Sequence, residues 1–218
     1  MRSNSSTIYI GIDPGNKGAV AFLTDDEPER RALILDLPVQ VHKLKAKRAD
    51  GTRREEREID GGLLCHALFS EVCPAAPVTV HVAVEALIRK GPRPLDQRQV
   101  FNYGKTVAAV ESFSEMARGR DVTLDFVRVS AAVVRAHFRL GGESYEGRKE
   151  EAVKFVAERW GRTDLVKYPP VRLKKDGTPY ARQPAPEIAD GRADALLIAS
   201  WLRDTVRRQG GERARLRP

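Results

Sequence analysis

An apolar run that ends on a single carboxylate does most to constrain how this chain can fold. Residues 8–12 read Ile-Tyr-Ile-Gly-Ile, Asp13 follows, and Pro14-Gly15 then breaks the run. A near-continuous apolar run of this kind predicts a strand covered on both faces of a sheet, with Asp13 at its carboxyl end. Asp-Pro-Gly is also an ordinary turn sequence, so the run by itself leaves the role of Asp13 open.

Two further segments present acids in comparable settings. Residues 78–85 give the strongest strand signal of the chain and end on Glu85, for which a salt bridge is the alternative to a functional role. The last predicted helix begins near residue 188 and carries Asp190 and Asp194 four residues apart, on one face. Like charges at this spacing repel, and Arg192 between them points elsewhere, so a metal ion is the expected partner. Packing this helix across the sheet would bring all four acids together.

The remaining pattern predicts an α/β fold. Residues 8–12 and 19–23 read as a hairpin, and 31–38 and 124–129 as further strands. Helices are expected over 60–72, to about residue 117, around Arg135, and from residue 147. Residues 42–58 and 168–186 read as surface loops, the first basic and the second rich in proline. We predict one domain over 1–205 and a basic flexible tail over 206–218.

The charge balance points to a polyanionic partner. The 218 residues include 38 Lys and Arg against 30 Asp and Glu, a formal charge of +8 with a pI near 9.7. Nucleic acid is the commonest partner of such a chain. The alternative is that GC-rich coding in the host produces an Arg-rich chain with the same charge balance. A basic loop over 89–98 directly follows Glu85 and is suited to phosphates, or else is merely solvated.

Several function classes are disfavoured. Residues 15–18 lack the GxxxxGK spacing, so no nucleotide cofactor is expected. No stretch approaches the roughly 20 apolar residues of a membrane span, and no apolar run follows the start as in a signal peptide. Cys65 and Cys73 lie about 12 Å apart on one predicted helix, too far for a disulfide. Reduced thiols predict a cytoplasmic protein, associated with the nucleoid or encoded by a phage.

The four acids suggest a reaction. Carboxylate oxygens suit Mg²⁺ or Mn²⁺ better than zinc, and no cluster of His and Cys competes with them. In a basic protein, clustered carboxylates favour phosphodiester hydrolysis assisted by two metal ions. The four histidines sit apart from any candidate nucleophile, so a Ser-His-Asp or Cys-His arrangement is not indicated.

The motifs in this order resemble those of RuvC-type Holliday junction resolvases. The segments that carry the likeness are residues 10–15, Val84-Glu85, and residues 190–199, and together they extend it over most of residues 8–202. The likeness is closer to the phage and chloroplast branch, whose last motif has the same four-residue spacing of acids, whereas bacterial RuvC spaces them by three. Residues 101–105, Phe-Asn-Tyr-Gly-Lys, also resemble that branch.

The resemblance implies a ribonuclease H-like fold with a five-stranded mixed sheet flanked by helices. It also implies a homodimer that places paired symmetric nicks in four-way junction DNA, with two Mg²⁺ ions (or Mn²⁺) in each active site. The implied metal ligands are Asp13, Glu85, Asp190 and Asp194, and the implied basic catalytic residues are Lys149 and Arg135. Arg148 is an alternative to Lys149, and Arg135 replaces the usual Lys of the family.

The loop after Glu85 would lie at the junction centre. The predicted DNA-binding residues are Arg89, Lys90, Arg93, Gln97, Arg98, Asn102, Tyr103, Lys105 and Arg148. Three alternatives share some of these features. The Gly-Ile-Asp opening also resembles actin-like ATPases, which need two such domains and therefore a longer chain. A ribonuclease H or transposase-type nuclease would share the acids, and a non-catalytic DNA-binding module would keep the fold and usually lose an acid.

Overall fold

The computed structural model describes residues 6–15, 17–47, 53–75, 77–88, 96–141, 144–167 and 187–215. Strand β1 (Ser6–Ile12) lies at the centre of a five-stranded sheet, antiparallel to β2 (Ala19–Thr24) and parallel to β6 (Val78–Glu85). Strands β3 (Leu33–Asp36) and β7 (Val122–Val129) form the edges, in the order β3-β2-β1-β6-β7. Only β2 runs against the others in this sheet. This mixed sheet confirms the predicted α/β class and its ribonuclease H-like arrangement.

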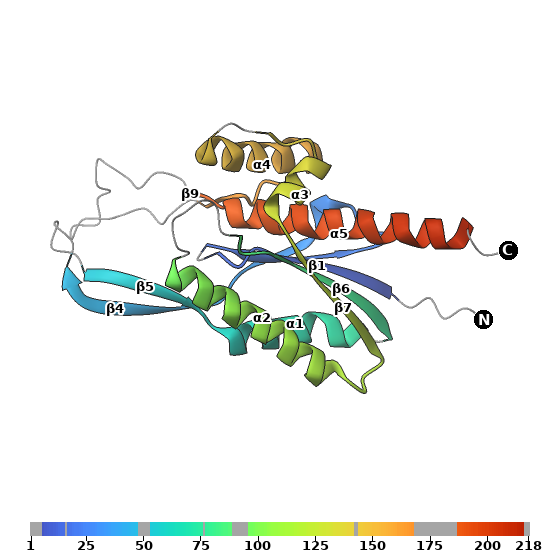
Figure 1. The fold of residues 1–218 in the computed structure, drawn as a ribbon, viewed down its shortest axis with the longest axis horizontal. Helices are drawn as coiled ribbons and strands as arrows, with labels where there is room; N and C mark the ends of the chain where they lie inside the picture. The colour runs from blue at the N-terminus through green and yellow to red at the C-terminus, as the bar shows by residue number, and fades with distance from the viewer. Residues whose placement is uncertain are drawn as a thin grey trace, which may run out of the picture.

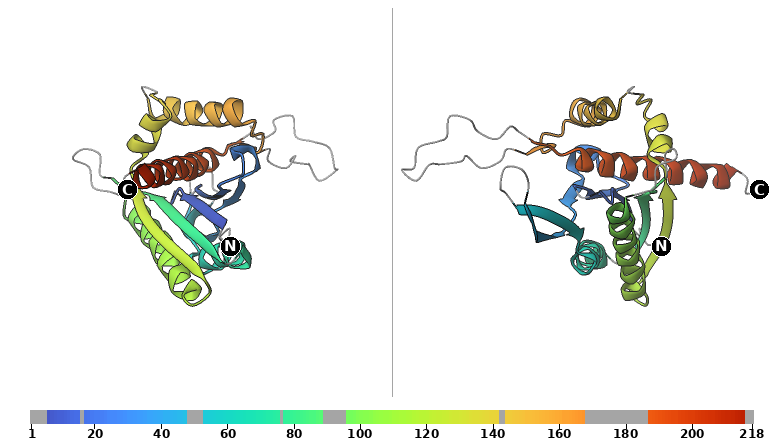
Figure 2. Two further views of the ribbon diagram at one scale, coloured as in Figure 1. Left: turned by 90° about the vertical axis from the view of Figure 1, so that its right-hand side faces the viewer. Right: turned by 60° about the vertical axis from the view of Figure 1, so that its left-hand side comes forward.

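Helices cover both faces of the sheet (Figures 1 and 2). Helices α1 (Gly61–Val72) and α2 (Gln97–Ala117) lie on one face, and α5 (Asp190–Arg215) lies on the other. Helices α3 (Ala131–His137) and α4 (Tyr145–Trp160) pack against α5 from outside. As the strand alternation predicts, Val80, Val82 and Val84 join the α1–α2 core, and Ala83 joins the α5 core.

Helix α5 lies directly on the backbone of β1. An added Cβ at Gly11 would overlap main-chain atoms of Ala195 and Ala199, so no side chain separates the two elements. Ala195 and Ala199 are fully buried, and their small size permits this close approach. The contact fixes the helix against the strand that leads to Asp13.

The described residues of the segment 42–58 form strands, so the prediction of a loop there was wrong. Strands β4 (Val39–Lys47) and β5 (Arg53–Ile59) form an antiparallel hairpin that extends from the body beside α2 (Figure 1). Its base is fixed by the buried Asn102 side chain, which accepts a hydrogen bond from the Ile59 N–H at 3.1 Å. Charged residues on both faces of the hairpin hide the apolar alternation by which a half-buried strand is recognised.

The end of the chain also differs from the prediction. Helix α5 continues to Arg215, so most of the predicted flexible tail over 206–218 is helical. Arg207 Nε contacts Asp25 Oδ1 at 3.1 Å, and this ion pair holds the helix beyond its apolar part. The predicted proline-rich loop over 168–186 lies outside the described residues.

Short elements complete the described chain: the turns η1 (Glu29–Arg31) and η2 (Cys73–Ala75), and the paired strands β8 (Val166–Lys167) and β9 (Glu187–Ile188). Asp60 caps α1 by accepting a hydrogen bond from the Leu63 N–H, as its position predicts. Cys65 and Cys73 are not joined to each other. None of the helices in the described part of the chain combines the length and apolar character needed to span a bilayer.

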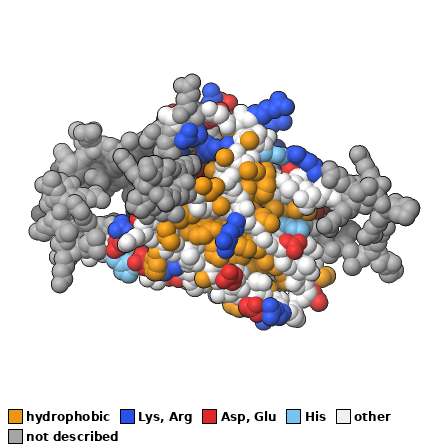
Figure 3. All heavy atoms as spheres, in the orientation of Figure 1, with side chains coloured by type: hydrophobic (Ala, Val, Ile, Leu, Met, Phe, Trp, Pro, Cys, Tyr) orange, Lys and Arg blue, Asp and Glu red, His pale blue; other side chains and the backbone are white. Residues whose placement is uncertain are grey.

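One face of the molecule is rich in exposed apolar side chains. Figure 3 shows them gathered across the middle of the face that α2 and β7 present. The exposed large hydrophobic residues include Val100, Phe101 and Met116 of α2, Val127 of β7 and Val133 of α3. Strand β7 is also an edge of the sheet, and unpaired edges tend to be covered by another element or another chain.

Candidate active site

The carboxyl ends of two parallel strands bring the first two acids together. The register pairs Ile12 of β1 with Val84 of β6, so Asp13 and Glu85 follow side by side at one end of the sheet. The Asp13 N–H donates to the Ala19 carbonyl at 3.0 Å, and its Oδ1 accepts from the Gly15 N–H at 3.0 Å. The Pro-Gly turn after β1 therefore fixes both the backbone and the carboxylate of Asp13.

The first turn of α5 supplies the other two acids. Asp190 begins the helix and Asp194 lies one turn later. Between them Gly191 is buried against the turn that follows Asp13, and a Cβ there would overlap the Lys17 carbonyl and Gly18. A side chain at position 191 would push this turn of the helix away from Asp13.

The four acids line one cavity, as the sequence predicts from packing the last helix across the sheet. The cavity has a volume of about 440 Å³, and its basic lining residues are Lys17, Arg135, Arg148 and Lys149. These come from the turn after β1, from α3 and from the start of α4. Four carboxylates and four cations therefore meet at the carboxyl end of the sheet.

Two of these cations pair directly with the helix acids. Lys149 forms an ion pair with Asp190, and Arg135 Nη2 lies 3.0 Å from Asp194 Oδ1. Arg135 also donates through Nη1 to the Arg148 carbonyl at 2.6 Å, which links α3 to α4. Arg192 points away from the cavity, as predicted. The sequence suggested a metal ion as the partner of these two acids; distant residues of α3 and α4 supply cations as well, and the metal stays a prediction.

The cavity shifts the proton affinity of two carboxylates. The pKa of Asp13 is well above its usual range, because burial and the charges of Glu85, Asp194 and Asp190 outweigh the Gly15 N–H. Burial also raises the pKa of Asp194, against the opposing effect of Arg135. Burial and the neighbouring carboxylates therefore disfavour the ionised form of these two acids more than the nearby cations favour it, which is common where a site binds a cation or performs chemistry.

The donor set fits Mg²⁺ or Mn²⁺ by its chemistry, since all four acids offer carboxylate oxygens. The crowded charge at Asp13 is the second feature that favours a cation. In the described part of the chain, however, no three His, Cys, Asp or Glu side chains are grouped as ligands around one point. Asp190 and Asp194 are instead paired with Lys149 and Arg135.

The predicted DNA-binding residues divide into several groups. Arg89, Lys90 and Arg93 lie outside the described residues, while Gln97 is exposed and Tyr103 and Arg148 line the cavity. Arg98 and Lys105 face the hairpin, where they pair with Glu56 at 2.7 Å and Glu58 at 3.0 Å.

Asn102 lines the cavity and also holds the hairpin, and its predicted role in DNA binding stays a prediction. Its side chain is 1% exposed and holds the backbone of β5, accepting from Ile59 N–H and donating to the Arg57 carbonyl at 3.4 Å. The hairpin that it holds was missed in the sequence, so this structural role of Asn102 was missed as well.

Two polar side chains of the cavity escaped the sequence analysis. Lys17 is exposed in the turn after Asp13, and Gln99 lies in the first turn of α2. Lys17 could have been found, because a cation four residues beyond a strand-end acid in a tight turn must lie close to it. Gln99 carries no such signal, since its place in the cavity depends on how α2 packs.

The fold and the cavity define a class: a ribonuclease H-like α/β protein with acids from β1, β6 and α5 at one end of its sheet. No protein-family model and no curated protein matches the chain. Among solved structures it is similar to Thermus thermophilus RuvC in complex with a Holliday junction substrate, with 16% identity and a TM-score of 0.46 over 95% of this chain and 97% of that one.

A second similar structure is the yeast mitochondrial Holliday junction resolvase, with 15% identity and a TM-score of 0.43. That alignment covers 94% of this chain and 81% of the yeast chain. Both structures are RuvC-like resolvases, the family that the motifs resemble. The similarity does not distinguish the branches of that family, and the phage and chloroplast branch stays a prediction. The fold assignment itself rests on the strand order and strand directions described above.

Proposed function

We propose that the chain is a metal-dependent endodeoxyribonuclease that resolves four-way DNA junctions by paired symmetric nicks. The observation that carries the proposal is the convergence of Asp13, Glu85, Asp190 and Asp194 in one cavity that basic residues also line. Acids alone would repel a phosphodiester, and cations alone would bind it without any means of activating water. Their combination is suited to hydrolysis of a phosphate backbone.

Within this proposal the four carboxylates hold Mg²⁺ or Mn²⁺. When bound, a pair of such ions supplies an activated water and stabilises the leaving 3′ oxygen. The backbone N–H of Gly15 and the β1–β6 register keep Asp13 and Glu85 in place as ligands. Gly191 lets Asp190 and Asp194 approach them from α5.

The basic residues would have two tasks in turn. Before metal and DNA bind, Lys149 and Arg135 offset the charges of Asp190 and Asp194. The same two side chains would contact the scissile phosphate, for which a guanidinium or ammonium group is suited. Lys17, exposed at the mouth of the same cavity, would contact the neighbouring phosphate.

Paired nicks require two active sites, and we propose that the protein acts as a homodimer. The exposed apolar residues Val100, Phe101 and Met116 of α2, with Val127 of the edge strand β7, support this, since an apolar face of this kind is typical of an interface. Two copies joined through one shared face would be related by a two-fold axis, and so would the two nicks that they make.

The test compares cleavage of a synthetic four-way junction, a DNA duplex of the same sequence and an RNA–DNA hybrid, each with Mg²⁺ and with EDTA. We expect Mg²⁺-dependent nicks at symmetric positions in two opposite strands of the junction, and little cleavage of the duplex. Faster cleavage of the hybrid would instead assign the chain to the ribonuclease H-type nucleases. Junction binding without any cleavage in Mg²⁺ or Mn²⁺ would make it a non-catalytic binding module.

A further inference from the structure

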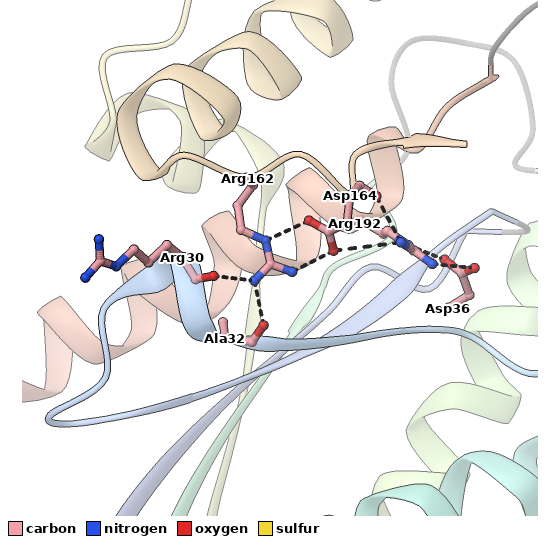
Figure 4. Close-up of polar contacts among 6 residues, drawn as sticks. All are labelled: Arg30, Ala32, Asp36, Arg162, Asp164 and Arg192. Atoms are coloured by element: carbon pink, nitrogen blue, oxygen red, sulfur yellow. Dashed lines mark hydrogen bonds and ion pairs between the residues drawn. The ribbon is translucent and has the colours of Figure 1, made fainter. Parts of the chain in front are cut away.

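Four charged residues form a chain of contacts beside the cavity without lining it (Figure 4). Arg192 Nε and Nη2 donate to the two carboxylate oxygens of Asp36 at 2.8 and 3.0 Å. Its Nη1 donates to the Asp164 carbonyl at 2.9 Å. Arg162 in turn holds the Asp164 carboxylate through two hydrogen bonds, of 2.8 and 2.6 Å.

The contacts join three segments that are distant in the sequence. Asp36 ends the edge strand β3, Asp164 follows α4, and Arg192 lies in the first turn of α5. Arg162 Nη1 also donates to the carbonyls of Arg30 and Ala32, at 3.1 and 2.7 Å, just before β3. The first turn of α5 is thus tied to the sheet edge and to the segment after α4.

Arg192 occupies a special place on its helix. It lies between Asp190 and Asp194, two residues from each, so its side chain leaves the opposite side of the same turn. One side of this turn contributes acids to the cavity, and the other side is fastened to β3. Asp36 is itself placed by the sheet, because β3 pairs with β2 so that Asp36 lies opposite Ala19, at the end of the turn that follows Asp13.

We propose that Arg192 is a positioning residue: its contacts with Asp36 and Asp164 set the rotation and distance of the first turn of α5 and thereby place Asp190 and Asp194 against Asp13. The proposal rests on the proposed function, because it assigns these acids a shared cation. Gly191 permits the close approach, and Arg192 holds it. The bidentate guanidinium–carboxylate geometry gives the contact a direction that a single ion pair lacks.

The test measures Mn²⁺ affinity by electron paramagnetic resonance, without DNA, for the wild type, Arg192→Ala, Arg192→Lys and Asp36→Asn. We expect about a tenfold loss of Mn²⁺ affinity in Arg192→Ala, as for other residues that orient metal ligands without touching the metal. Arg192→Lys restores part of it, because an ammonium can contact Asp36 or the Asp164 carbonyl but lacks the fork that spans both. The Mg²⁺ concentration for half-maximal junction cleavage should rise by the same factor as the Mn²⁺ dissociation constant.

The matched control is Arg207→Ala. Arg207 lies on the same helix and also pairs with an aspartate near the sheet, Asp25, but roughly 22 Å further along the helix axis. We expect Arg207→Ala to lower the melting temperature as much as Arg192→Ala does and to leave Mn²⁺ affinity unchanged. If Arg192→Ala changes only the melting temperature, its role is structural and the positioning proposal is overturned.

The two proposals fail in different ways. A wild-type protein that binds Mn²⁺ but cuts no junction refutes the proposed nuclease, and the Mn²⁺ affinities still decide the role of Arg192. A nuclease whose Mn²⁺ affinity and Mg²⁺ requirement are the same in the wild type and Arg192→Ala refutes the positioning role alone. A wild-type protein that binds no Mn²⁺ refutes both.

Discussion

The two ends of α5 both meet the sheet through charges, and they differ in how these charges are balanced. Near its far end, Arg207 pairs with Asp25, and Arg203 pairs with Glu29. At its start, Asp190 and Asp194 face Asp13 and Glu85, and the pKa values of Asp13 and Asp194 are raised. The far end has two ion pairs, whereas at the start burial and neighbouring acids raise the pKa of two carboxylates, so that ionising them costs stability. Carboxylates with a raised pKa in a cavity are common at functional sites.

The largest difference between the two ends should appear on neutralising one acid at each. Asp13→Asn is expected to abolish Mg²⁺-dependent junction cleavage, because it removes a proposed ligand at the centre of the cavity. Junction affinity should persist, since basic residues supply it. Asp25→Asn, at the far end, should cleave at the wild-type rate. The measurements are single-turnover cleavage and fluorescence anisotropy, and loss of junction affinity in Asp13→Asn would contradict the division of roles.

A smaller but still large contrast is expected between two glycines of the same helix. Gly191→Ala should reduce cleavage at least tenfold and lower the melting temperature, because its Cβ would overlap the Lys17 carbonyl. At Gly210 a Cβ meets nothing within 4 Å, so Gly210→Ala should stabilise the helix by about 0.5–1 kcal/mol. Thermal unfolding and cleavage rates check both variants. If the two variants had the same cleavage rate and melting temperature, the start of α5 would not pack closely on the turn after Asp13.

The smallest expected effect is on the pH dependence of stability in the metal-free protein. Because the folded protein raises the pKa of Asp13, ionising this group costs stability, and the cost appears as pH rises above the usual range of an Asp. In EDTA, Asp13→Asn should therefore match the wild type near pH 4 and become more stable than it towards pH 8. The difference is measured by thermal unfolding of both proteins across this pH range.

The pKa of Asp164 is shifted in the opposite direction from that of Asp13. Burial raises its pKa, but the hydrogen bond and charge of Arg162 prevail and lower it. Its ionised form therefore stabilises the fold above the usual pKa of an Asp, and this stability is lost as pH falls through the lowered value. Asp164→Asn should be less stable than the wild type at pH 7, with the difference fading in acid. The same sign of pH dependence in both variants would contradict the assignment of opposite electrostatic environments.

The sequence predicts the central strands of the sheet well because they are largely buried on both faces. The runs at 8–12 and 78–85 are almost wholly apolar, and such runs have few alternatives. The meeting of the four acids also follows from sequence, since strand ends and a helix face fix where side chains lie. The β4–β5 hairpin was missed because its strands carry charges on both faces, which hides an apolar alternation.

The partners of the acids could not be predicted in the same way. That Lys149 and Arg135 reach Asp190 and Asp194 depends on how α3 and α4 pack on α5, which no local pattern encodes. The same holds for Arg192, whose partners Asp36 and Asp164 lie 156 and 28 residues away. Acids at the ends of strands can be recognised in the sequence, whereas the cations that pair with them are found only in the tertiary structure.

The absence of any side chain between Gly11 and α5 has a consequence for how this protein can evolve. Where two elements touch through their main chains, their separation does not change when neighbouring core residues are exchanged for larger or smaller ones. Most substitutions in the hydrophobic core therefore leave the distance between Asp13 and the acids of α5 unchanged. Homologous chains could diverge almost completely in sequence around this point and still present the same four carboxylates to a substrate.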